Sequence, residues 1–111
     1  MYASRSGLDL EQVLRSVTNG AAGSWALSNL APRIVDDDLA PGFLVDHLVK
    51  DLGLVLADAD RSGLTLPGLA LARDLYRTLQ EQGHGRDGTQ ALVHAVAELS
   101  GLTWPPDTDR S

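Results

Sequence analysis

Lys50 and its neighbours are the residues whose types and spacing could best support chemistry in this sequence. Lys50 lies one turn before Gly53, inside a predicted helix over residues 43–61. A glycine inside a helix costs about 1 kcal/mol relative to alanine, so it usually meets a packing or functional need. Here it would leave space beside the lysine for a flat ligand or another backbone, and Asp46 could pair with Lys50. The residues alone slightly favour the alternative, a surface Lys–Asp pair beside a helix–helix contact.

Two other motifs look like ligand-binding loops but lack the parts that such loops need. Residues 83–88 match the dinucleotide pattern GxGxxG, yet a predicted helix precedes them where the motif requires a strand. We expect Gly83 to end that helix and Asp87 to cap the next one. Residues 58–63 match the first half of a calcium loop, but its twelfth position, which needs a bidentate glutamate, is Leu69. Neither motif predicts a binding site.

The remaining acidic and histidine side chains form no pattern typical of a metal site or of nucleophilic catalysis. Residues 36–38 are consecutive aspartates, for which a solvated loop is a better interpretation than a divalent cation site. His47 and Asp51 share a helix face at i and i+4, but two ligands do not make a zinc site, and a surface pair is favoured. His84 and His94 are expected to be exposed and receive no role. The sequence therefore predicts no catalytic residue and no metal site.

The composition is that of one small helical domain with a negative charge. The chain has 111 residues, a formal net charge of −6 and no cysteine. Leucine and alanine dominate its apolar residues, and these suit helices better than sheets. The lack of a basic stripe argues against nucleic-acid binding, and no run of about 18 apolar residues could span a membrane. We therefore expect an all-α, cytoplasmic protein whose partners are neither nucleic acid nor membrane.

The spacing of apolar residues predicts a compact bundle of about five helices. Asp9 is a capping signal for the first helix and Ser24 for the second, which Pro32 should kink or loosen. Residues 1–101 are expected to form the domain, and residues 102–111, rich in proline and aspartate, a flexible tail. The predicted helices cover residues 9–18, 24–35, 43–61 and 67–82, with a last one between Asp87 and Gly101.

Several short motifs, taken together, resemble those of a known enzyme family. The main ones are Gly23-Ser24-Trp25-Ala26-Leu27, Ala31-Pro32-Arg33, Pro41-Gly42-Phe43 and, the most specific, Lys50-Asp51-Leu52-Gly53-Leu54. Weaker similarity continues through Leu66-Pro67, Ala72-Arg73, Leu75-Tyr76 and Gly83-x-Gly85-x-x-Asp87. The sequence resembles, over residues 2–99, the C-terminal domain of the 3-hydroxyisobutyrate dehydrogenase (β-hydroxyacid dehydrogenase) family. The resemblance implies an all-α fold like the C-terminal domain of 6-phosphogluconate dehydrogenase.

The resemblance also implies a function and a set of site residues. In this family an N-terminal Rossmann domain binds NAD or NADP, and the substrate cleft lies between that domain and the all-α domain. Hydride transfer between the nicotinamide and a β-hydroxyacid gives a semialdehyde. By resemblance, Lys50 would contact the cofactor, and Phe43 and Asp51 would line the substrate cleft. Ser24 and Trp25 would support dimer or interdomain packing.

The same resemblance implies that this chain is not active alone. It contains no strand–glycine-loop–helix unit for the pyrophosphate, and no match to the segment with the family's catalytic lysine, which Lys50 is not. NAD or NADP would bind the full-length enzyme, and this chain weakly or not at all. The expected partners are the missing Rossmann domain, a small hydroxyacid and, in a homodimer, a second copy. The alternatives are a non-catalytic helical interaction or dimerisation module and, with less support, an unrelated helical binding protein.

Overall fold

All regular elements in the described part of the chain are helices, which confirms the predicted all-α class. The computed structural model describes residues 1–107. None of the helices in this range is long and apolar enough to cross a membrane. The helices are α1 (Tyr2–Arg5), α2 (Leu10–Thr18), α3 (Trp25–Asn29), α4 (Ala31–Val35), α5 (Val45–Arg61), α6 (Pro67–Glu81), the short 3₁₀ helix η1 (Thr89–Ala91) and α7 (Leu92–Leu99).

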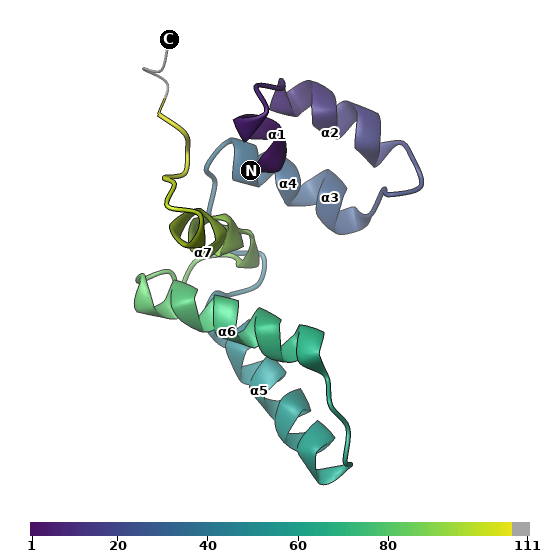
Figure 1. Cartoon of the computed structure of the whole chain (residues 1–111), viewed down its shortest axis with the longest axis vertical. Helices are drawn as coiled ribbons and strands as arrows, with labels where there is room; N and C mark the ends of the chain where they lie inside the picture. Colours follow the sequence, from purple (N-terminus) through teal and green to yellow (C-terminus); the bar gives the residue numbers. More distant parts are fainter. Residues whose placement is uncertain (108–111) are drawn as a thin grey trace.

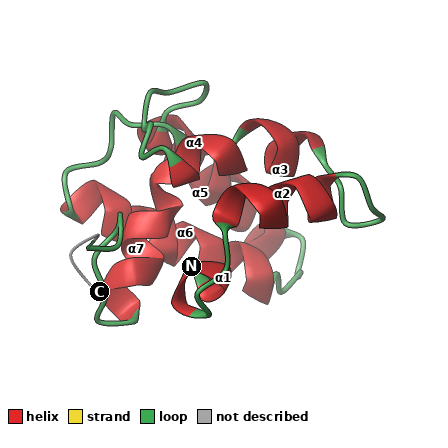
Figure 2. Ribbon diagram, turned by 90° about the horizontal axis from the view of Figure 1, so that it is seen from above, coloured by secondary structure: helices red, strands yellow, loops and turns green. Residues whose placement is uncertain are grey.

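The helices form a more extended arrangement than the predicted compact bundle. The principal-axis extents are 52 × 33 × 23 Å. In Figure 1, α1–α4 lie together in one half, α5 and α6 form an arm that projects from the other half, and α7 lies between them. Contacts follow this division, because α5 packs along α6, α6 packs on α7, and α2 packs on α3 and α4. Figure 2 shows the same helices from above, joined by loops.

The first two predicted helices begin at their predicted caps, but the second is broken in two. The Asp9 carboxylate accepts a hydrogen bond from the backbone N–H of Gln12 at 3.2 Å, and the Ser24 hydroxyl accepts one from Leu27 at 3.0 Å. At Leu30, α3 ends and α4 begins. Pro32 lies in the first turn of α4, where its missing N–H removes no helical hydrogen bond. The expected kink is therefore a complete break.

Two clusters of buried side chains make up the core, and α7 belongs to both. Val45 on α5 and Leu79 on α6 are fully buried and pack with Ala91 and Ala95. The second cluster consists of Val93, Ala97 and Trp104, with Met1, Leu10, Ile34 and Leu102 packed against it. Because alanine side chains are small, α7 can approach its neighbours closely. This helix therefore holds the α5–α6 arm against the rest of the molecule.

The packed part of the chain extends beyond Gly101, where the predicted domain ends. Gly101 follows α7 with a positive φ of 65°, as expected at a helix C-terminus. Trp104, which belongs to the predicted flexible tail, is only 8% exposed, and its indole N–H donates to the backbone oxygen of Ile34 at 3.0 Å. This long-range packing of a large aromatic side chain shows that the predicted boundary is too early. Residues 108–111 of the predicted tail lie outside the described residues.

A tyrosine hydroxyl joins α6 to η1 and makes fold stability sensitive to alkaline pH. The Tyr76 hydroxyl donates to the backbone oxygen of Thr89 at 2.9 Å, and burial raises the pKa of Tyr76. Because the folded-state pKa is the higher one, this contribution is complete below about pH 10, the unfolded value. It is lost as the pH rises further through the folded-state pKa.

Tyr76→Phe is therefore expected to lower the free energy of unfolding by about 1 kcal/mol at neutral pH. The difference between wild type and variant should shrink above about pH 10, where the wild-type phenol ionises. Urea unfolding followed by circular dichroism at several pH values measures both effects. Tyr2→Phe is the matched control, because Tyr2 is 87% exposed. A difference that does not change with pH would contradict the role given to the Tyr76 phenol.

Candidate functional site

Five exposed residues at the start of α5 form one continuous surface, which we call the α5 face: Phe43, His47, Lys50, Asp51 and Leu54. From His47 onward they recur at i, i+3, i+4 and i+7, so they share one side of the helix. The phenyl ring of Phe43, just before the helix, contacts the His47 ring edge-on at 6.0 Å between centroids. The structure thus brings together Lys50, Phe43 and Asp51, the three predicted site residues.

The polar groups of the α5 face have no ionic partners among the described residues. The possible pair between Asp46 and Lys50 does not form. The Asp46 carboxylate instead accepts a hydrogen bond from the Gln80 side chain on α6 at 2.8 Å. His47 and Asp51 lie beyond ion-pair distance of each other, so the favoured surface pair is also wrong. Exposed i,i+4 ion pairs contribute only about 0.3–0.5 kcal/mol, too little to force either pairing. The charges of Lys50 and Asp51 are therefore available to a ligand.

The predicted space at Gly53 is present. A methyl group added to Gly53 would meet no atom within 4 Å of the new carbon. Gly53 is half-buried, although it lies in the middle of α5. A flat ligand or a second backbone could thus approach the helix next to Lys50 without displacing any side chain.

A loop that follows α6 holds the start of α5 in place. This loop comprises residues 85–90. Its backbone runs antiparallel to the approach to α5, with a bridge between Leu44 and Gly88. Backbone hydrogen bonds join the two segments. Val45 N–H donates to Asp87 O and Asp46 N–H donates to Gly85 O, both at 2.9 Å. Gly88 N–H donates to Leu39 O at 2.8 Å, and Thr89 N–H donates to Phe43 O at 3.1 Å. Two first-turn donors of α5, which have no partner within the helix, are thus satisfied.

Close approach explains the glycines of the GxGxxG pattern better than phosphate binding does. A Cβ on Gly85 would overlap the Asp46 carboxylate, and one on Gly88 would overlap the Gln90 carboxamide. The pattern follows α6 and no strand, so it lacks the setting of a dinucleotide loop. Gly83 ends α6 with a φ of 91°, as predicted. Asp87 does not cap the next helix, because Gly88 occupies that position.

Gln90 is a buried positioning residue near the candidate site that the sequence analysis missed. It is 4% exposed and is the one buried polar side chain among the described residues. Its amide nitrogen donates to the backbone oxygens of Asp38 at 3.0 Å and Ala40 at 2.9 Å, and its buried amide oxygen has no hydrogen-bond partner in the described structure. Gln90 thus secures the loop that carries Phe43. A polar residue just before the apolar run from Ala91 was the available signal.

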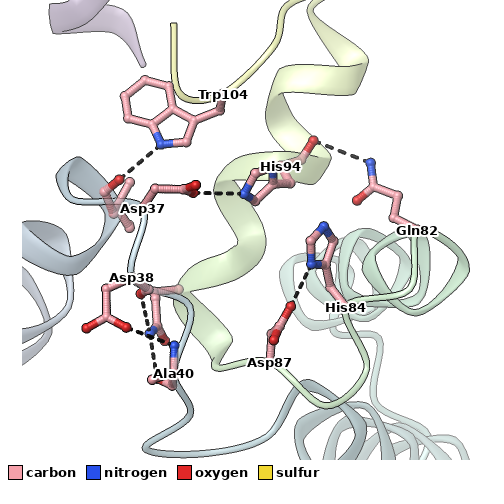
Figure 3. Close-up of polar contacts among 10 residues, drawn as sticks. Asp37, Asp38, Ala40, Gln82, His84, Asp87, His94 and Trp104 are labelled. Atoms are coloured by element: carbon pink, nitrogen blue, oxygen red, sulfur yellow. Dashed lines mark hydrogen bonds and ion pairs between the residues drawn. The ribbon is translucent and has the colours of Figure 1, made fainter.

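The two remaining histidines are half-buried and stacked, which corrects the prediction that they are exposed. The rings of His84 and His94 lie 4.8 Å apart at an interplanar angle of 23°. Figure 3 shows that each ring faces an aspartate. His84 Nδ1 lies 2.7 Å from Asp87 Oδ2, and His94 Nε2 lies 3.3 Å from Asp37 Oδ1, within ion-pair range but without hydrogen-bond geometry.

This histidine cluster connects three elements, and none of its residues belongs to the α5 face. Asp37 follows α4 and has a left-handed φ of 52°, which is uncommon for a residue other than glycine. His84 follows α6, and His94 belongs to α7. No group of three or more potential ligands in residues 1–107 is placed to hold a metal ion. The cluster is therefore best described as a polar junction between the two halves.

Comparison with known proteins identifies the family of this chain. The family model described as "NAD-binding of NADP-dependent 3-hydroxyisobutyrate dehydrogenase" matches residues 1–96. The uncharacterized oxidoreductase YkwC of Bacillus subtilis is 52% identical over 82% of this chain and 32% of its own length. The probable 3-hydroxyisobutyrate dehydrogenase-like protein 1 of Arabidopsis thaliana is 46% identical over 93% of this chain and 31% of its own length.

A relative with a named activity and a solved structure extend the comparison. The L-threonate dehydrogenase of Escherichia coli K12 is 34% identical over 93% of this chain and 33% of its own length. The crystal structure of 3-hydroxyisobutyrate dehydrogenase from Salmonella typhimurium superposes with a TM-score of 0.77 and 33% identity, over 83% of this chain and 32% of that one. This chain spans about a third of the length of these relatives. It belongs to the NAD(P)-dependent 3-hydroxyisobutyrate dehydrogenase family.

Proposed function

We propose that this chain is the substrate- and cofactor-contacting domain of an NAD(P)-dependent β-hydroxyacid dehydrogenase. The observation that carries the proposal is the α5 face, which exposes Lys50 and Asp51 without internal partners. Opposite charges at i and i+4 stabilise a helix, but here the Asp46 carboxylate, which could pair with Lys50, is bound to Gln80 on α6. A helix face that leaves its charges unpaired beside the open space at Gly53 is suited to a polar, flat ligand.

Three residues of the face have a proposed role. Lys50 donates hydrogen bonds to the nicotinamide end of the cofactor, which fits the free ammonium group and the open space one turn later. Phe43, 44% exposed, covers the substrate and excludes water, and Asp51 accepts a hydrogen bond from a substrate hydroxyl. The bound nicotinamide supplies the hydride chemistry, and the protein supplies placement. In this proposal the strand–glycine-loop–helix unit for the pyrophosphate and the catalytic lysine, neither of which has a match in these 111 residues, come from another part of the enzyme, so we expect the chain alone to be inactive.

The test is a chimera in which this chain replaces the matching third of the E. coli L-threonate dehydrogenase. NAD(P)-dependent oxidation of L-threonate and of 3-hydroxyisobutyrate is followed by absorbance of the reduced nicotinamide. We expect activity with at least one of these hydroxyacids, and none from this chain alone. A folded chimera that is inactive with both substrates would contradict the proposal, and so would activity from the isolated chain.

A non-catalytic interaction or dimerisation module is the second candidate function. Large apolar side chains on several elements favour association, since Trp25, Leu71 and Leu99 are 72%, 61% and 73% exposed. A homodimer is compatible with either candidate, and an inactive chimera together with a dimeric chain would favour the second. The absence of cysteine suits a reducing compartment, and we propose a cytoplasmic location.

A further inference from the structure

His47 is the one histidine of this chain that has no polar partner among the described residues. His84 and His94 each have an aspartate oxygen, at 2.7 Å and 3.3 Å. His47 has no hydrogen bond or ion pair, and its recorded contact is the edge-on approach to the Phe43 ring. It is exposed on the first turn of α5. Both ring nitrogens are therefore open to a ligand, while the aromatic contact limits the directions in which the ring can point.

The place of His47 on the α5 face puts it between the two proposed ligands. It lies four residues after Phe43 and three before Lys50, and residues at these spacings are neighbours on a helix surface. Phe43 is proposed to cover the substrate and Lys50 to contact the nicotinamide end of the cofactor. Hydride transfer requires the substrate and the nicotinamide to touch. A group between Phe43 and Lys50 thus faces the substrate next to the reacting atoms.

Of the charged residues near His47, Lys50 favours an anionic ligand group, whereas the Asp51 carboxylate, four residues later on the same helix side, opposes it. The ammonium group of Lys50 is unpaired, and the adjacent Asp46 carboxylate is turned toward Gln80 on α6. The helix terminus does not compete for this ligand, because the N–H groups of Val45 and Asp46 donate to Asp87 and Gly85. The imidazole N–H and the ammonium group are therefore the donors available on this face. Asp51 is the one acidic group of the α5 face.

We propose that His47 is a specificity-determining residue that donates a hydrogen bond to the carboxylate of the hydroxyacid substrate. The inference rests on the proposed dehydrogenase function and adds a substrate contact to it. The ligand group that His47 would bind is an oxyanion. A phosphate of the cofactor could supply such a group as well as the substrate carboxylate. Separate Michaelis constants for the hydroxyacid and for NAD(P) distinguish these sources.

The experiment uses the active chimera with His47→Leu, His47→Gln and, as a matched control at the far end of α5, Arg61→Gln. With His47→Leu, KM for the hydroxyacid is expected to rise about tenfold, as for the loss of one hydrogen bond to a charged group. The KM for NAD(P) and the kcat should change little. His47→Gln keeps an N–H donor and should recover part of the loss. The neutral amide of the same hydroxyacid should react with the same KM in wild type and His47→Leu.

Three results would overturn the inference while leaving the proposed function intact. One is an unchanged KM for the hydroxyacid in His47→Leu, and another is an equal rise for the acid and its amide. The third is a rise in KM for NAD(P) alone, which would assign His47 to a cofactor phosphate. If the chimera is inactive, the proposed function fails, and the inference is tested separately by NMR of this chain with L-threonate and its amide. A His47 imidazole signal that does not move with L-threonate would then overturn it.

Discussion

Lys50→Met is expected to lower kcat/KM of the chimeric dehydrogenase by about 100-fold, comparable to the loss of one well-placed donor in an active site. The proposed reason is that the ammonium group of Lys50, which has no ionic partner in the described structure, is available to bind the ligand. Methionine has a similar length but provides neither the charge nor the donors. Steady-state rates at varied NAD(P) and hydroxyacid concentrations measure the effect and show which ligand is affected.

Two controls separate loss of binding from loss of fold. Lys50 is exposed, so Lys50→Met should change the free energy of unfolding by no more than about 0.5 kcal/mol. Arg61→Gln removes a positive charge from the other end of α5 and should keep nearly full activity. Activity of Lys50→Met close to that of wild type would exclude Lys50 from the cofactor contact. An equal loss in Arg61→Gln would point to a general electrostatic effect instead.

Gly88→Ala is expected to lower the free energy of unfolding by about 2–3 kcal/mol, the range for disrupting a buried polar network. The new methyl group would overlap the Gln90 carboxamide and displace its nitrogen from the backbone oxygens of Asp38 and Ala40. Backbone strain is not the cause, because Gly88 has φ −69° and ψ 159°, which alanine adopts readily. Urea unfolding of the isolated chain, followed by circular dichroism, measures the change.

A double-mutant cycle tests whether Gln90 is the side chain that Gly88 accommodates. Gln90→Ala alone should also destabilise the chain, because two backbone oxygens lose their donor. In Gly88→Ala/Gln90→Ala the new methyl group would occupy the space that the Gln90 side chain has left. The decrease in the free energy of unfolding should therefore be smaller than the sum of the two single decreases by at least about 1 kcal/mol. Gly68→Ala is the matched glycine control, since a Cβ there meets no atom within 4 Å. Strict additivity of the two changes would refute this account of Gly88.

The elements that the sequence could predict are those set by local interactions. The cap at Asp9, the cap at Ser24 and the helix end at Gly83 each depend on residues within three or four positions, and all three are present. The length of α5 was also predictable, since apolar residues repeat along it and Gly63 follows its end. The helical grouping of the α5 face follows from the same periodicity.

The missed features depend on contacts between distant parts of the chain. Asp46 bonds to Gln80 and not to Lys50, although the two bonded residues are 34 positions apart. Gln90 reaches the backbone of Asp38 and Ala40 across 52 and 50 positions. Trp104 contacts Ile34 across 70 positions, although its proline- and aspartate-rich surroundings are typical of a tail. Local spacing cannot choose between partners of this kind, because it says nothing of which helices meet.

The order in which the chain emerges during synthesis has a consequence for α5. The backbone oxygens that accept from Val45 and Asp46 belong to Asp87 and Gly85, some forty positions later. Until the ribosome has released those positions, the first turn of α5 has only water to satisfy these donors, and closing so long a segment is slow relative to helix formation. The side chains from Phe43 to Lys50 thus acquire their final orientation late, after α6 is complete. A nascent chain arrested before Gly85 would carry these residues without the backbone contacts that hold the start of α5 in place.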